Sequence, residues 1–260
     1  MLDIFPATQW RVEQWKTMPE VLGVVLVGSR SRGHADALSD DDLEVLLTDE
    51  AHAALSPAEC IEVKFDDMEP LKLVYDAQIT TLSDLERKAG SAIDLDHWPY
   101  ERARVLLDRD GRTTEAVRAA ARMDPDFRLK RLRHATVDAW VASRRATKTM
   151  QRGFEGSGRL LIARSAKAMA RLVFALEWRW VPLDHWLEAD MRTLEDPAQA
   201  GPALIEAVVN GSARPIDDAL ARLEDRLAGE GVPRQEGRRE LFLQLVHPSN
   251  TEERAIHGLP

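Results

Sequence analysis

The sequence predicts an α/β domain at the N-terminus and an all-helical domain at the C-terminus. From Val21 to about Thr81, short apolar runs alternate with turn-forming segments, which is typical of strands. Beyond Thr113 apolar residues recur at helical spacing, and the pattern changes only once along the chain. We therefore expect two domains, residues 1–113 and residues 114–260.

The first domain is expected to open with a helix and continue with strands. The helix, Thr8–Thr17, presents two tryptophans. The segment Asp66–Pro70 is expected to form a hairpin turn, because aspartate and proline favour turns between apolar runs. A tight turn at Asp108–Gly111 ends the last strand. The expected strands are Val21–Val27, Leu43–Thr48, Ile61–Phe65, Leu71–Thr80 and Val105–Leu107, with a short helix at Leu82–Lys88.

The second domain is expected to contain helices only. Glycine and proline residues interrupt its helical pattern, and Gly156-Ser157-Gly158 separates the first two helices. We find no internal repeat and no low-complexity tract in it. The expected helices are Arg128–Arg152, Leu160–Trp180, Leu183–Leu194, Ala203–Val209 and Ile216–Leu227.

The composition limits the partners and the location. No segment approaches the roughly twenty uncharged apolar residues of a membrane span, and the first residues lack a signal-peptide pattern. Cys60 is the only cysteine, so no internal disulfide can form, which fits a cytoplasmic protein. The net charge of −9 disfavours nucleic acid as a partner and suits a cationic small substrate. The oligomeric state stays open.

The segment Gly28–Leu47 carries the chemical signal. Alternation at its end places Asp40, Asp42 and Glu44 on one face of a strand and Leu43, Val45 and Leu47 on the other. Carboxylates two residues apart on a strand project in parallel, so they can share a divalent cation. Without a cation they repel each other. The spacing therefore predicts a metal site.

The turn just before these carboxylates is suited to phosphate. Gly28 and Ser29 end the preceding apolar run, and they offer backbone N–H groups and a hydroxyl. Arg30 and Arg32 follow with guanidinium groups that match phosphate geometry. A phosphate cradle next to metal-holding carboxylates predicts phosphoryl or nucleotidyl transfer.

This segment resembles the signature of the nucleotidyltransferase superfamily, in which Gly-Ser follows a hydrophobic strand and Asp-x-Asp lies on the next strand. It is similar to the subgroup that contains aminoglycoside and lincosamide nucleotidyltransferases and many uncharacterised bacterial relatives. The resemblance implies a nucleotidyltransferase-like fold with a mixed sheet in the first domain. The matching residues are Gly28, Ser29, Arg30, Arg32, Gly33, Ala35, Ser39, Asp40, Asp42 and Leu43.

The resemblance also implies a reaction. The first domain would be catalytic and the helical domain would bind substrate. Asp40 and Asp42 would hold one or two Mg²⁺ ions, and Gly28 and Ser29 would seat the β- and γ-phosphates of ATP or another nucleoside triphosphate. A hydroxyl of the acceptor would then receive AMP, or another nucleoside monophosphate.

A neighbouring strand should supply a third carboxylate. The candidates are Glu62, Asp66, Glu69 and Asp76. Asp76 interrupts a largely apolar strand, where an unpaired carboxylate is costly, and it lies shortly before the expected short helix. We therefore assign it as the third metal ligand. Glu62 is the second choice, as a ligand or as the base that takes the hydroxyl proton.

Two acceptor classes and one other activity stay open. A small hydroxylated compound such as an aminoglycoside antibiotic is the first choice, from the length, two-part layout and acidity of the chain. A tRNA or protein hydroxyl is the principal alternative. The segment Arg128–His134 also fits the Arg-x(4–6)-His pattern of the helical ribonucleases that pair with minimal nucleotidyltransferases in toxin–antitoxin systems.

Overall fold

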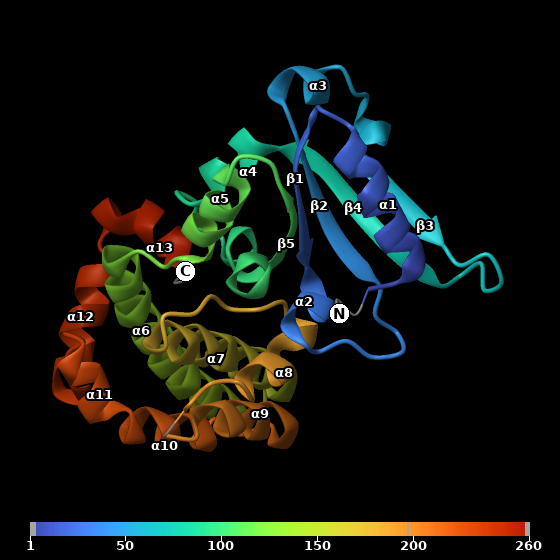
Figure 1. Cartoon of the computed structure of the whole chain (residues 1–260). Coiled ribbons are helices and arrows are strands. Elements are labelled where there is room, and N and C mark those ends of the chain that lie inside the picture. Colours follow the sequence, from blue (N-terminus) through green and yellow to red (C-terminus); the bar gives the residue numbers. More distant parts are fainter. Residues whose placement is uncertain (1–3, 197, 258–260) are drawn as a thin grey trace. The chain divides into compact units, whose positions relative to one another are not determined.

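The computed structural model describes residues 4–196 and 198–257 and divides into two compact units, residues 1–122 and 123–260 (Figure 1). The first unit contains a mixed sheet with helices, and the second contains helices, so the predicted fold class is confirmed. The division follows α5 (Arg112–Ala121), whereas the sequence analysis placed the boundary at residue 113, near the start of that helix.

The sheet of the first unit has five strands in the order β3-β4-β2-β1-β5. The β2–β4 pair is parallel, with residues 48–72 forming the crossover between these two strands, and the other pairs are antiparallel. The strands are β1 Val21–Val27, β2 Asp41–Leu47, β3 Ile61–Phe65, β4 Leu73–Thr81 and β5 Arg104–Asp108.

Helices pack on both faces of this sheet. On one face α1 (Pro6–Thr17) buries Val12 and Trp15 against β1, β2 and β4, and Figure 1 shows this helix lying along the sheet. On the other face Leu85, Tyr100 and Val117 pack against the remaining side chains of β1 and β2. The other elements of the unit are α2 Gly28–Arg32, α3 Asp49–Ala53, η1 Pro57–Cys60, α4 Leu82–Lys88, η2 Asp94–Asp96 and η3 Trp98–Arg102.

The second unit is built around two long helices. Leu132, Met169 and Phe174 are buried in its core, and no helix among the described residues is long and apolar enough to cross a membrane. Its elements are α6 Pro125–Gln151, α7 Glu155–Leu176, η4 Asp184–Trp186, α8 Leu187–Met191, α9 Ala200–Asn210, α10 Arg214–Arg222, α11 Glu224–Gly229, η5 Gln235–Gly237, α12 Arg238–Leu245, η6 Pro248–Asn250 and α13 Thr251–His257.

The expected break between the first two helices of this unit was placed wrongly. Gly156 and Gly158 lie inside α7 rather than before it. A Cβ at position 158 would lie 2.2 Å from Met150 Sδ, so this glycine allows α6 and α7 to approach closely where they meet. Gly158 therefore serves helix packing, which outweighs its low helix propensity, whereas a Cβ at Gly156 would meet open space.

Gly23 of β1 allows α5 to pack on the sheet. A Cβ at this position would lie 2.2 Å from Thr113 Oγ1, and Thr113 is fully buried. We expect Gly23→Ala to destabilise the first unit by about 1–3 kcal/mol through overpacking, measured by thermal unfolding. Gly90→Ala is the control, because its nearest contact would be 3.8 Å away. Equal melting temperatures for the two variants would contradict this packing.

Candidate active site

Three carboxylates lie together at one end of the sheet, and we call them the carboxylate triad. Asp40, Asp42 and Asp76 each offer an oxygen, and these oxygens lie within 4.8 Å of one another. Asp42 on β2 is directly opposite Asp76 on β4 in the parallel ladder, and Asp40 immediately precedes β2. The structure thus brings together the three residues that the sequence analysis assigned to the metal.

The triad is electrostatically strained. Burial, with the charges of Asp40 and Asp76, raises the pKa of Asp42 to about 7. Burial and the charge of Asp40 also raise the pKa of Asp76. A divalent cation relieves this repulsion, and three carboxylate oxygens form a donor set that suits Mg²⁺. The triad therefore fits the metal that the sequence predicts.

Gly28 lies directly against the triad. It immediately follows β1 and begins α2 with a φ of +69°, and a Cβ there would lie 1.8 Å from Asp42 Oδ2. Both the backbone conformation and the close approach therefore require glycine. The next residue, Ser29, is 4 % exposed, and its backbone N–H donates to the Asp42 carboxylate, which lowers the pKa of Asp42 and partly offsets the effect of burial.

Arg30 forms a salt bridge with Asp41, the middle residue of the run Asp40–Asp42. Its Nε lies 2.6 Å from Asp41 Oδ1, and it donates to the carbonyl of Ser39. Asp41 also accepts the backbone N–H of Phe5 at 2.9 Å, and its side chain is fully buried on the sheet face opposite Asp42. This pair holds the loop before β2 against the start of α1, a role that the sequence analysis did not foresee.

Arg32 is also engaged within the protein. Its side chain is 1 % exposed, and it donates to the carbonyl of Trp98 at 2.8 Å and to Glu101 at 3.2 Å. The guanidinium group stacks on the indole of Trp98. Contact of Arg30 and Arg32 with a triphosphate stays a prediction, because both groups have protein partners in this structure.

A second buried polar cluster lies next to the triad. Glu44 follows Asp42 by two residues on the same face of β2, and both its oxygens accept from the hydroxyl of Tyr100 at 2.6 Å. Lys88 Nζ lies 3.1 Å from Glu44. Burial and the Glu44 charge raise the pKa of Tyr100, so the hydroxyl stays protonated and donates. The alternation of β2 indicated the position of Glu44 but not these two partners.

The other acidic candidates lie elsewhere. Glu62 pairs with Arg11 at 2.6 Å and accepts from the hydroxyl of Tyr75 at 2.6 Å, on the sheet face that α1 covers. Asp66 accepts backbone N–H groups of its own turn, including that of Glu69. Among the four candidates from the sequence, the described contacts place only Asp76 in the triad.

The two residues of the ribonuclease pattern have separate partners in the second unit. Arg128 pairs with Glu230 at 2.6 Å and donates to a carbonyl at the end of α7. The His134 side chain is fully buried, with its Nε2 3.0 Å from Glu253. Burial lowers the pKa of His134, which keeps the ring neutral. These contacts are structural and give no support to a nuclease site.

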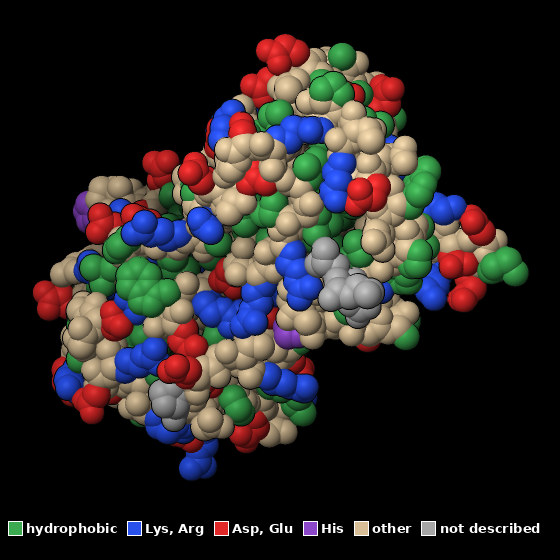
Figure 2. All heavy atoms as spheres, in the orientation of Figure 1, with side chains coloured by type: hydrophobic (Ala, Val, Ile, Leu, Met, Phe, Trp, Pro, Cys, Tyr) green, Lys and Arg blue, Asp and Glu red, His purple; other side chains and the backbone are tan. Residues whose placement is uncertain are grey.

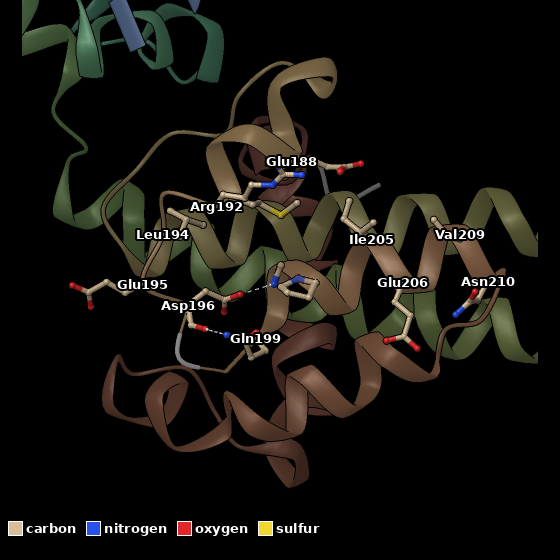
Figure 3. Close-up of a pocket in the computed structure, with 13 residues that line it drawn as sticks. Glu188, Arg192, Leu194, Glu195, Asp196, Gln199, Ile205, Glu206, Val209 and Asn210 are labelled. Atoms are coloured by element: carbon tan, nitrogen blue, oxygen red, sulfur yellow. Dashed lines mark hydrogen bonds between the residues drawn. The ribbon is translucent and has the colours of Figure 1, made fainter. Parts of the chain in front are cut away.

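The second unit contains a cavity of about 680 Å³ along α8 and α9 (Figure 3). Met191, Leu194 and Ile205 contribute apolar surface, and several glutamates lie at its margin. Asp196 in its wall accepts the backbone N–H groups of Ala200 and Gly201 at the start of α9, so it serves as a helix cap. The cavity is large enough for a small molecule.

Comparisons with known proteins give limited information. No family model and no curated protein match the chain. Among solved structures, the chain is similar to a nucleotidyltransferase-like protein from Exiguobacterium sibiricum 255-15, at 16 % sequence identity and a TM-score of 0.47. The similarity covers 97 % of this chain and 88 % of that chain. At this identity and TM-score it bears on neither activity nor substrate.

The raised pKa of Asp42 predicts a pH-dependent stability. In the metal-free protein this pKa is about 7, against 3.8 for an ordinary aspartate, so the folded state keeps a proton that the unfolded chain releases. The protonated Asp42 carboxyl therefore makes its full contribution to the free energy of unfolding below about pH 4, and this contribution is lost as the pH rises through 7. Asp42→Asn removes this loss, so its melting temperature should rise relative to that of the wild type between pH 4 and pH 8.

Thermal unfolding in a chelating buffer measures this difference. Glu20→Gln is the control, because Glu20 is exposed and distant from the triad in the sequence. Added Mg²⁺ should raise the melting temperature of the wild type at pH 8 more than that of Asp42→Asn. Wild-type and Asp42→Asn melting temperatures that stay parallel across this range would contradict the assignment.

Proposed function

We propose that the protein is a metal-dependent nucleotidyltransferase that transfers AMP, or another nucleoside monophosphate, from a nucleoside triphosphate to a hydroxyl of a small acceptor. The observation that carries this proposal is the position of the triad. Its three oxygens lie within 4.8 Å of one another, and the turn at Gly28 approaches so closely that any side chain there would collide with Asp42. The turn and the carboxylates therefore form one site.

The triad would hold one or two Mg²⁺ ions. Mg²⁺ bound there would neutralise charge on the triphosphate and orient it for attack. Gly28 and Ser29 would seat the β- and γ-phosphates, because this turn lies directly against Asp42, one of the residues that would hold the metal. Arg30 and Arg32 would hold this turn in place, Arg30 through its salt bridge with Asp41 and Arg32 through its hydrogen bond to the carbonyl of Trp98.

The reaction balances without a further reactant. A bond forms between the acceptor oxygen and the α-phosphorus, and the bond from that phosphorus to the bridging oxygen of the β-phosphate breaks. Pyrophosphate leaves from the side of Gly28. The hydroxyl proton passes to the triad, where Asp76 is our choice for its acceptor because β4 lies on the side of β2 away from β1 and the turn at Gly28.

Net charge and the helical unit indicate the class of acceptor. The net charge of −9 supports a cationic compound such as an aminoglycoside as the first acceptor to test, and it weighs against tRNA. We propose the helical unit as the substrate-binding domain, because it contains a cavity of about 680 Å³. A protein hydroxyl is the remaining alternative. Incubation with labelled ATP, Mg²⁺ and these acceptors identifies the one that gains AMP.

Substitution of the triad tests the reaction. We expect Asp40→Asn and Asp42→Asn each to lower AMP transfer by at least about a hundredfold, roughly 3 kcal/mol of activation free energy, because each removes a metal ligand. Both variants should remain folded, since each loses one of several carboxylates that repel one another. Transfer is measured at saturating Mg²⁺.

The exposed Glu20→Gln serves again as the control and should retain wild-type turnover. Near-normal turnover in folded Asp42→Asn would refute the assigned role. Metal-independent RNA cleavage that His134→Ala abolishes would instead place the activity in the helical unit.

A further inference from the structure

The edge strand β3 exposes its apolar side chains. Ile61, Val63 and Phe65 are 58, 51 and 46 % exposed, whereas Glu62 and Lys64 between them are partly buried. A solvated edge strand normally shows the reverse pattern, because exposed apolar edges invite unwanted association. Glu62 explains this reversed pattern. Its contacts with Arg11 on α1 and Tyr75 on β4 turn the polar face of β3 inward, so the apolar side chains face outward.

This exposed face continues the face of the triad. Val63 is directly opposite Asp76 in the antiparallel β3–β4 ladder, and Ile61 is opposite Gln78. Asp76 is in turn opposite Asp42 in the β2–β4 ladder. Side chains that are directly opposite each other project to the same face of a sheet. Val63 is therefore the neighbour of the triad on the side away from β1.

A cavity of about 610 Å³ lies between the loop before β2 and the turn before β4. Leu38 and Leu71 line it and are 94 and 98 % exposed, and Leu73 adds further apolar surface. The lining also includes Ser39, the residue immediately before Asp40 of the triad. Figure 2 shows hydrophobic side chains exposed at the end of the hairpin that joins β3 and β4.

The direction from which the acceptor hydroxyl attacks the α-phosphorus indicates that the acceptor contacts this surface. This step rests on the proposed function, in which pyrophosphate leaves from the turn at Gly28, at the end of β1. In phosphoryl transfer the attacking and leaving oxygens lie roughly in line on opposite sides of the phosphorus. The strand order β3-β4-β2-β1 places β3 beyond the triad from Gly28. The acceptor hydroxyl must therefore approach from the side of β4 and β3.

We infer that the acceptor carries its reacting hydroxyl on an uncharged, apolar framework, which packs on Ile61 and Val63 and extends towards Leu38 and Leu71. Burying the exposed apolar area of these side chains favours such a framework. An aminoglycoside fits this surface poorly, because its ammonium groups would lose hydration against aliphatic side chains. The exposed apolar face of β3 thus favours an uncharged acceptor over the cationic one that net charge favours, and it places the reacting part of the acceptor on the first unit rather than in the cavity of the helical unit.

Binding measurements test this without turnover. The protein is loaded with Mg²⁺ and an ATP analogue whose α–β bridge is a methylene group, and is then titrated with 4-methylumbelliferyl β-D-glucoside or with kanamycin. Methyl NMR should show shifts at Ile61 and Val63 with the glucoside and none with kanamycin. Val63→Lys should weaken glucoside binding by about tenfold or more, since it replaces apolar contact by a hydrated charge.

Trp10→Lys is the matched control, because Trp10 is 64 % exposed on α1, which covers the opposite face. Kanamycin shifts at these methyl groups, an unchanged affinity in Val63→Lys, or no glucoside binding would each overturn the inference. So would a dimer that Val63→Lys dissociates, which would assign the surface to a second copy. Failure of the ATP analogue itself to bind would instead refute the proposed function, a result separable from these.

Discussion

Repulsion among three partly buried carboxylates is the constraint on which the rest of the site depends. The parallel register of β2 and β4 places Asp42 opposite Asp76, and Asp40 adds a third charge. The neighbouring acids are neutralised, Asp41 by Arg30 and Glu44 by Lys88, whereas the described salt bridges include no member of the triad. The fold thus pairs the acidic groups on either side and leaves one cluster available for a cation.

The sequence was sufficient for the local features of this site. The alternation after Asp40 predicted a shared face, and a lone carboxylate on an apolar strand singled out Asp76. Gly28 was expected to form a turn at the end of a strand, but not to lie against Asp42, because that contact depends on how β1 and β2 pair. The partners of Arg30 and Arg32 are distant in sequence, so no local pattern could indicate them.

Helix boundaries were less predictable for a related reason. Local propensity treats Gly158 as a helix breaker, but its close contact with Met150 makes it a packing residue inside α7. In the same way Gly23 fits the buried Thr113 and so joins α5 to the sheet. Tertiary packing decides such positions, and periodicity within one segment does not report it.

On the sheet face that carries the triad, the kind of side chain therefore differs from one strand to the next. The glycine turn follows β1, the triad lies on β2 and β4, and aliphatic side chains lie on β3. This order matches a reaction in which a charged leaving group departs at one side and an apolar acceptor enters at the other.

Mn²⁺ binding followed by electron paramagnetic resonance tests most directly whether the triad binds a divalent cation. We expect wild-type protein to bind Mn²⁺ with more protons released per ion at pH 6 than at pH 8, because Asp42 has a pKa of about 7, and we expect Asp42→Asn to lose this binding. Equal Mn²⁺ binding by the wild type and Asp42→Asn, or none by the wild type, would contradict the account.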